Sequence, residues 1–442
     1  MKYISGSMAA IMLLCMACSN GMKRGDASNK MSYQSTGDSL PQPYASKSVM
    51  NFSKVIGWPE GKTPVAPEGF TVMPFATGLI NPRNIYVADN GDVFVAEANT
   101  VITGLKRIGA AIIGASKAQR LDESANRITL LRDTNNDGLP DQRTVFLSNL
   151  DMPFGMLIIN NYFYVANTDA LWRYPYKAGD TMMVSKGEKI VSLPKGGYNN
   201  HWTRNLLANK DKTKIYISVG SGSNAAENGM EDEIRRANIL EINPDGSGEK
   251  IYAGGLRNPV GMGWAPGTNT LWATVNERDK LGDELVPDYA TSVKQDGFYG
   301  WPYSYFGQHE DPRLKDIQRP DLVKKAIVPD IALGAHTASL GLVFYDASAF
   351  PEKYHGGMFI GQHGSWNRSV LSGYKVVFIP FRNGIPSGKP EDFLTGFIAD
   401  ASKKQVYGRP VNLAVLKNGS LLLADDSGNT IWMITGNKQA QK

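Results

Sequence analysis

The sequence predicts an all-β fold, a six-bladed β-propeller with long inter-blade loop insertions, and three observations support this prediction. Short apolar or alternating runs recur along the chain, while sustained helical periodicity is almost absent. Asn, Asp, Gly and Pro bound these runs, and 46 Gly and 24 Pro residues suit many tight turns. Six such units, spaced unevenly by about forty to ninety residues, match blades separated by insertions. A pair of β-sandwiches is the alternative architecture.

One apolar or alternating run marks each predicted blade. The runs are residues 92–97, 162–167, 214–219, 271–275, 357–361 and 420–425. Most follow a turn, and a second strand often comes next, as in residues 170–174 and 430–434. Inserted loops gather on one face of a propeller around its central channel, so we expect function on that face.

Two segments interrupt the strand pattern. Residues 103–127 are rich in Ala and predict a short helix or a flexible excursion. Residues 280–330 are long and aromatic, above all at 298–306. Trp and Tyr there suit either the wall of a ligand cleft or a core cluster that covers a strand.

The N-terminus predicts export. Residues 1–18 combine Lys2 with an apolar stretch too short to span a bilayer, and they end at Cys18 in a lipoprotein-type signal. We expect a periplasmic or cell-envelope lipoprotein whose contact with the membrane is a lipid anchor at Cys18. Residues 19–60, with few apolar positions, predict a flexible tether, and residues 61–437 the propeller domain.

The charge of the chain is modest. The 442 residues carry a net charge of +5, with Lys and Arg scattered among Asp and Glu. Because the sequence has no run of basic residues that could follow a phosphate backbone, a nucleic-acid partner is not expected.

An Arg-bearing turn and a solitary histidine are the first candidates for chemistry. Residues 254–262 read Gly-Gly-Leu-Arg-Asn-Pro-Val-Gly-Met, about fifty residues after His201. Arg257 is a fixed cation on a rigid turn, and a neutral His201 can take a proton while that cation stabilises an oxyanion. An Arg-capped turn without catalytic function is the alternative.

Three further loops carry polar side chains. Residues 133–141 place oxygens at Asp133, Asn135, Asp137 and Asp141, as in a calcium loop, although an Asx-rich turn has the same composition. Residues 361–368 are dense in hydrogen-bond donors and suit an anionic or polar ligand. The glycine-rich residues 220–224 follow no nucleotide-loop spacing and predict a turn.

Several motifs, taken in order, resemble the soluble quinoprotein sugar dehydrogenases that use pyrroloquinoline quinone (PQQ), and most closely their sorbosone- and pyranose-dehydrogenase-like branch. The resemblance covers about residues 65–436. The motifs are residues 200–206, 255–259, 275–279 with 281–283, 300–303, 363–368 and 408–411.

The resemblance implies a six-bladed propeller that uses PQQ and calcium to oxidise an aldose or related sugar, at a hydroxyl or an aldehyde hydrate, by hydride transfer to the quinone. It leaves the sugar and the electron acceptor open. By this resemblance, His201 is the general base, and Arg257 and Asn258 contact the quinone oxygen and the substrate. Arg409 is expected to clamp a carboxylate of the cofactor, and Asn367 and Arg368 lie on a loop that holds the cofactor. The backbone carbonyls of Arg278 and Asp279 are expected to bind calcium.

Two other functions remain alternatives at this stage. One is a non-catalytic propeller that binds carbohydrate or a protein partner, since binding sites also keep Arg and His. The other is a metal-dependent lactonase-type propeller, for which Glu277, Asp279 and Asp283 are the clustered acidic candidates.

Overall fold

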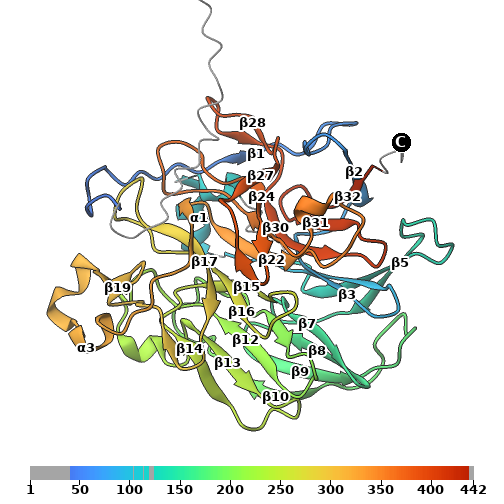
Figure 1. The fold of residues 1–442 in the computed structure, drawn as a ribbon, viewed down its shortest axis with the longest axis horizontal. Coiled ribbons are helices and arrows are strands. Elements are labelled where there is room, and N and C mark those ends of the chain that lie inside the picture. Colours follow the sequence, from blue (N-terminus) through green and yellow to red (C-terminus); the bar gives the residue numbers. More distant parts are fainter. Residues whose placement is uncertain (1–39, 103, 113, 119–123, 438–442) are drawn as a thin grey trace, which may run out of the picture.

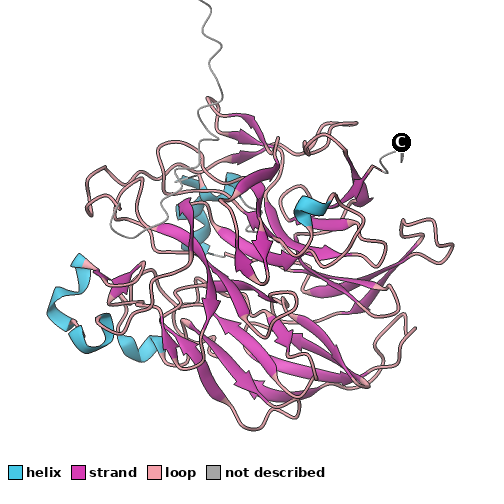
Figure 2. Ribbon diagram, viewed as in Figure 1, coloured by secondary structure: helices cyan, strands magenta, loops and turns pink. Residues whose placement is uncertain are grey.

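The computed structural model describes residues 40–102, 104–112, 114–118 and 124–437. Within these residues the chain is mostly β, with short helical segments at the periphery of the sheets (Figures 1 and 2). The predicted signal segment, the predicted anchor at Cys18 and residues 19–39 of the predicted tether lie outside the described residues. In the described part, no helix is long and apolar enough to cross a membrane.

Six antiparallel sheets with four main strands each follow one another along the described chain (Figure 1). The first comprises β3 (Pro82–Val87), β4 (Val93–Glu97), β5 (Arg127–Arg132) and β6 (Gln142–Leu147). The second comprises β7 (Met156–Ile159), β8 (Tyr162–Ala166), β9 (Ala170–Pro175) and β10 (Glu188–Ser192). The third comprises β11 (Leu206–Ala208), β12 (Ile215–Val219), β13 (Asn238–Ile242) and β14 (Lys250–Gly254), with β18 (Gly297–Phe298) added parallel to β14.

The remaining three sheets bring the two ends of the described chain together. The fourth comprises β15 (Pro259–Trp264), β16 (Leu271–Val275), β17 (Pro287–Val293) and β21 (Ile331–Ala335). The fifth comprises β22 (Ser339–Phe344), β23 (Met358–Gln362), β24 (Lys375–Ile379) and β27 (Glu391–Leu394). The sixth joins β30 (Pro410–Val415), β31 (Leu421–Asp425) and β32 (Thr430–Gly436) to the early strand β2 (Phe70–Ala76), which pairs with β32.

The first strands of the sheets contact one another in a closed ring. β3 contacts β7, and the contacts continue through β11, β15, β22 and β30 back to β3. An apolar cluster fills each of the six spaces between neighbouring sheets. Second strands such as β12 and β16 are buried at every position because a sheet covers each of their faces.

Besides the six sheets, the described residues form short helices, 3₁₀ turns and short strands. Within the segment at 103–127, the described residues form α1 (Gly104–Ile112) and α2 (Ala115–Ala118), which is the helical one of its two predicted alternatives. The others are β1 (Lys54–Val55), β19 (Ser304–Tyr305), β20 (His309–Glu310), β25 (Phe381–Arg382), β26 (Ile385–Pro386), β28 (Ile398–Asp400), β29 (Gln405–Val406), α3 (Pro320–Val323) and the 3₁₀ turns Met230–Glu233, Pro312–Ile317 and Glu352–Tyr354.

The aromatic segment at 298–306 is part of the core rather than a cleft wall. Tyr299, Tyr305 and Phe306 belong to the apolar cluster between the third and fourth sheets. Trp301 is also buried, and its indole nitrogen donates to the carbonyl of Asn224. Of the two interpretations of this segment, the core cluster is therefore the one that the structure favours.

Residues 40–60 differ from the predicted flexible tether because they lie against the ring of sheets. β1 pairs in parallel with β29, and the ring of Phe52 stacks on Trp366 at 5.5 Å. The indole of Trp58 donates to the buried carboxylate of Asp425 at 2.6 Å. A few aromatic side chains in an otherwise polar segment are sufficient to hold it against the domain.

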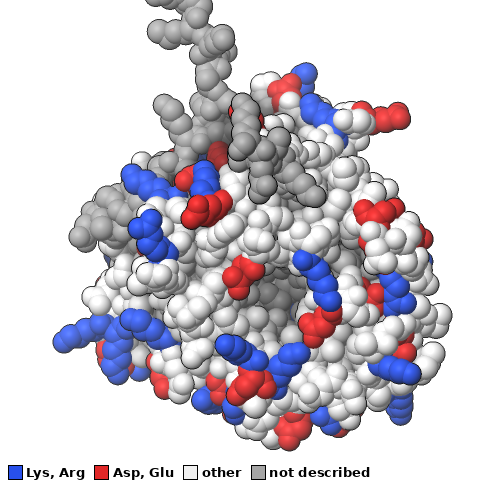
Figure 3. Space-filling view, turned by 45° about the vertical axis from the view of Figure 1, so that its right-hand side comes forward, with Lys and Arg blue, Asp and Glu red and all other residues white. Residues whose placement is uncertain are grey.

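Charged side chains on the surface are mixed in sign. On the face shown in Figure 3, basic and acidic groups are interspersed, without a continuous basic surface. A cavity at one end of the sheets is lined by more cationic than acidic side chains.

Candidate functional site

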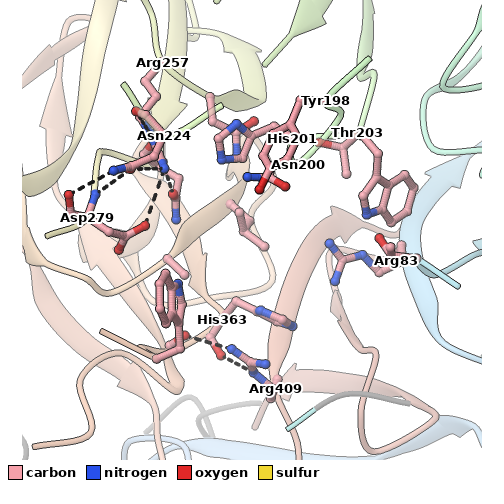
Figure 4. A pocket seen from close by; sticks show the side chains of 18 of the residues that line it. Arg83, Tyr198, Asn200, His201, Thr203, Asn224, Arg257, Asp279, His363 and Arg409 are labelled. Atoms are coloured by element: carbon pink, nitrogen blue, oxygen red, sulfur yellow. Dashed lines mark hydrogen bonds and ion pairs between the residues drawn. The ribbon is translucent and has the colours of Figure 1, made fainter. Parts of the chain in front are cut away.

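The candidate site is a cavity of about 450 Å³ where loops from all parts of the ring meet (Figure 4). Its walls come from the loops that precede the first strands and follow the second strands of the sheets. Of the residues predicted from sequence, His201, Arg257, Asn258, Asp279 and Arg409 all line it. Other lining residues include Arg83, Asn200, Trp202, Asn224, Glu227, Asn276, Lys280, His363 and Trp366.

His201 lies on the loop between β10 and β11, and its ring is oriented by Ser221. Nδ1 lies 2.8 Å from the carbonyl oxygen and 3.0 Å from the hydroxyl of Ser221. Because a carbonyl only accepts, Nδ1 carries the proton and Nε2 is left as the acceptor. Burial and the nearby Arg257 cation lower the pKa of His201 to about 3, so the ring is neutral at pH 7.

Arg257 stands beside this histidine, with its guanidinium held by the protein. Nε donates to the carbonyl of Asn224 at 3.1 Å, and Nη1 donates to the carbonyl of Glu277 at 2.7 Å. Nη2 donates to Oδ1 of Asn224 at 2.9 Å and lies 3.5 Å from Asp279. Arg257 therefore contributes a fixed positive charge to the wall, while its donors serve to hold three loops together.

The turn that carries Arg257 and Asn258 depends on glycine. Gly255 has φ +73°, and a Cβ there would lie 2.7 Å from the ring of Phe298. Asn258, which follows Arg257, is buried, and its Oδ1 has no hydrogen-bond partner among the described residues. Buried acceptors are rarely left without a partner, so this atom calls for a donor that the described residues do not supply.

The opposite wall contains a charged cluster that the sequence analysis did not identify. Nε2 of His363 lies 2.9 Å from the carboxylate of Asp426, which also pairs with Arg83. Burial and Arg409 lower the pKa of His363 to about 4, so the neutral ring donates its Nε2 proton to Asp426. Although burial opposes it, the proximity of His363 and Arg83 holds the pKa of Asp426 well below its usual value.

Arg409 precedes β30 and lies next to this cluster. Its Nε donates to the carbonyl of His363 at 2.9 Å, and Nη2 donates to the carbonyl of Gly364 at 2.8 Å. Nη1 donates to the carbonyl of Ala118 at 3.3 Å. Neutral carbonyls satisfy these donors without cancelling the charge, so Arg409 keeps this end of the cavity positive.

Asn367 and Arg368 were predicted beside the cofactor, but neither lines the cavity. Asn367 is buried, accepts from the amide of Lys280 and donates to the carbonyl of Val49. Arg368 pairs with Glu284 and donates to the carbonyl of Ala335. Their loop turns His363 and Trp366 toward the cavity, whereas Asn367 contacts the N-terminal segment and Arg368 contacts the fourth sheet and its loop.

Arg278 and Asp279 occupy different environments. The side chain of Arg278 is fully buried and pairs with Glu277 and Asp311. The carbonyl of Asp279, predicted to bind calcium, accepts from Arg313 at 2.9 Å and from Asn224 at 3.1 Å. Its carboxylate lines the cavity and lies 3.2 Å from Nδ1 of His336.

The predicted second calcium loop, residues 133–141, follows β5 and therefore lies at the end of the first sheet away from the cavity. Its oxygens accept from the loop's own backbone and hydroxyl groups: Asp133 from the amide of Gly138, Asp137 from Leu139, and Asp141 from Thr134. Among the described residues, no group of three or more His, Cys, Asp or Glu could hold a metal ion. Calcium binding here stays a prediction, and the Asx-rich turn accounts for the observed contacts.

Comparison with known proteins gives two family matches. Residues 63–365 match the family described as "Domain of unknown function (DUF7133)", and residues 318–437 match a family described as "TrAA12-like". An uncharacterised protein of Borreliella burgdorferi is 29% identical over 380 residues, which cover 83% of this chain and 89% of that protein.

The sequence is also similar to a named enzyme. It is 24% identical over 429 residues to the pyrroloquinoline quinone-dependent pyranose dehydrogenase of Coprinopsis cinerea, covering 83% of this chain and 54% of that protein. The chain thus spans about half the length of that enzyme.

Solved structures share the fold. The holo form of the PQQ domain of that pyranose dehydrogenase superposes with a TM-score of 0.67 at 18% identity, covering 87% of this chain and all of that domain. The calcium structure of a Trichoderma reesei carbohydrate-active enzyme of family AA12 gives 0.66 at 18% identity, covering 84% of this chain and 97% of that one. The chain belongs to the family described as a domain of unknown function, DUF7133, and is distantly related to the PQQ-dependent soluble sugar dehydrogenases.

Proposed function

We propose that this chain is a PQQ-dependent oxidoreductase built as a six-bladed β-propeller, and that it oxidises an aldose or related sugar. The closed ring of six sheets supports the propeller, with the sheets as its blades. The observation that carries the reaction is the state of His201, which is neutral, oriented through Nδ1 and open at Nε2 within a cationic cavity. A base in this state can take a hydroxyl proton.

The residues of the cavity fit PQQ. PQQ carries three carboxylates, and a cavity with more cationic than acidic side chains suits a polyanion. The buried Oδ1 of Asn258 adds an acceptor without a protein partner. The cationic lining residues are Arg83, Arg257, Lys280 and Arg409, and the acidic ones are Glu227 and Asp279.

The protein's part in the reaction follows from these positions. When bound, PQQ would supply the acceptor for the hydride that leaves the sugar carbon. Nε2 of His201 takes the proton of the sugar hydroxyl, and Ser221 keeps the ring turned toward the cavity. Burial and, after it, the charge of Arg257 keep the imidazole neutral before the reaction, and Arg257 stabilises negative charge that develops nearby.

Calcium does not fit the predicted carbonyl of Asp279 as it stands. A guanidinium nitrogen of Arg313 lies 2.9 Å from the carbonyl oxygen of Asp279, at a position where a cation would have to bind. The roles of the other cavity residues are therefore derived without a metal step.

The test is reconstitution of the purified full chain with PQQ and calcium, followed by dye reduction with a panel of sugars. We expect His201→Ala to lower kcat by roughly a hundredfold to ten-thousandfold, because a positioned general base contributes about that much. PQQ affinity should change little. His355→Ala is the matched control, since His355 lies outside the cavity lining.

Two results would count against the proposal. If the wild-type chain retains no PQQ after desalting, as judged by absorbance, the redox function fails and a non-catalytic binding propeller becomes the better hypothesis. If PQQ binds and His201→Ala turns over as fast as wild type, His201 is not the base.

A further inference from the structure

Arg83 is a cation in the cavity wall that the proposed reaction does not use. It lies near the start of β3, on the first sheet, and lines the cavity although only 8% of the residue is exposed. Sequence analysis did not identify Arg83, because this residue lies in none of the motifs that suggested the function.

One edge of this guanidinium is fixed and the other is open. Nη1 pairs with Asp426, and the guanidinium carbon lies 5.3 Å from the ring centroid of Trp202. These contacts set both the position and the tilt of the plane. Nε is buried without a hydrogen-bond partner, and Nη2 also has none among the described residues.

The other two guanidinium groups of the cavity differ in this respect. Arg257 and Arg409 each donate from Nε, Nη1 and Nη2 to protein oxygens. Arg83 therefore keeps, in the wall of the cavity, a pair of parallel N–H donors that no protein group uses. Leaving such donors buried and unpaired is costly, whereas a ligand that pairs with them recovers that cost.

The geometry of the open edge defines what it can bind. Nε and Nη2 form a planar fork that matches the two oxygens of a carboxylate. Asp426 offsets the charge of Arg83, and the nearby Arg409 supplies further positive charge at this end of the cavity. A neutral hydroxyl could use one donor but would not match both.

We propose that Arg83 anchors a carboxylate of the ligand in this cavity through its Nε–Nη2 edge. The identity of that ligand rests on the proposed function, which offers two sources of the same chemistry. One is a carboxylate of PQQ, and the other is the carboxylate of a uronic acid that serves as substrate.

Calorimetric titration of the purified full chain with PQQ and with its trimethyl ester tests the first source. We expect Arg83→Gln to weaken PQQ binding by about ten- to a hundredfold, as for loss of a charged hydrogen bond. The ester should bind wild type and Arg83→Gln equally, because its carboxylates are masked. Arg83→Lys should recover only part of the affinity, since an ammonium keeps the charge without the fork.

Arg143→Gln is the matched control. Arg143 is exposed, and its guanidinium donates to the carbonyls of Thr77 and Gly78, so PQQ affinity should not change. Thermal melting of each variant separates loss of a ligand contact from loss of folding.

The second arm compares glucuronate with glucose as substrate or ligand. If Arg83→Gln leaves PQQ affinity unchanged but abolishes a preference for glucuronate, the anchored carboxylate belongs to the substrate. A folded Arg83→Gln variant that matches wild type with PQQ, glucuronate and glucose would overturn the proposal. Failure of wild type to bind PQQ would instead count against the proposed function, and the glucuronate titration would still decide the role of Arg83.

Discussion

At the scale of single residues, the chemistry of His201 is set by neighbours that lie far from it in sequence. Ser221 fixes the tautomer through Nδ1, and Arg257 helps to keep the ring neutral. Asn200, which precedes the histidine, is not the group that orients it. A histidine arranged in this way stays unprotonated down to a lower pH than an ordinary imidazole.

Arg257 offers a test of this electrostatic arrangement. We expect Arg257→Gln to raise the pKa of His201 from about 3, because removal of a nearby cation favours the protonated ring. The acidic limb of kcat/KM, which reports the free enzyme, should then move to higher pH. Arg257→Lys keeps the charge and should leave the limb close to its wild-type position. An equal movement in both variants would show that geometry, and not charge, controls His201.

At the scale of elements, the glycine-rich turn after β12 positions two side chains of the site. Its composition predicted a turn, and the structure adds that Ser221 and Asn224 from this turn bind His201 and Arg257. Gly220 is required for the close approach. A Cβ there would lie 2.5 Å from Cβ of His201 and would also collide with Oδ1 of Asn258.

Gly220→Ala should therefore displace both of these side chains. We expect kcat/KM to fall by roughly a hundredfold, since small misplacements of catalytic groups are costly, with a loss of stability of about 1–3 kcal/mol from overpacking. Gly254→Ala is the control, because a Cβ on Gly254 meets nothing within 4 Å. Equal activity of the two variants, measured beside their melting temperatures, would contradict this role for Gly220.

Local patterns could predict the strands and part of the site. The run at 271–275 is β16, and its flanking turns were visible as Gly, Asn and Asp. His201, Arg257, Asn258 and Arg409 were found because they lie in recognisable motifs. The cluster of Arg83, His363 and Asp426 could not be found in the same way, because its members are brought together only by the tertiary fold.

At the scale of the whole molecule, closure of the ring makes the cavity. Pairing of β2 with β32 brings the first and last sheets together, so that Arg83 reaches Asp426 across a separation of 343 residues. His363 and Arg409 enter from the fifth and sixth sheets. Partial loss of closure would therefore separate the cationic wall from the loop that carries His201.

The buried histidines should also make global stability depend on pH. The folded chain keeps His201 and His363 neutral, with pKa values of about 3 and 4, whereas an unfolded histidine titrates near 6.5. As pH falls below 6.5 the unfolded state binds protons that the folded state does not, so stability decreases toward pH 4. Each group contributes up to about 1.4 kcal/mol per pH unit. The test is to measure the denaturant midpoint at pH 6.5, 5.5 and 4.5. The midpoint should fall more steeply with decreasing pH in wild type than in a His201→Gln/His363→Gln double variant. Equal slopes in the two proteins would show that these histidines do not control stability in acid.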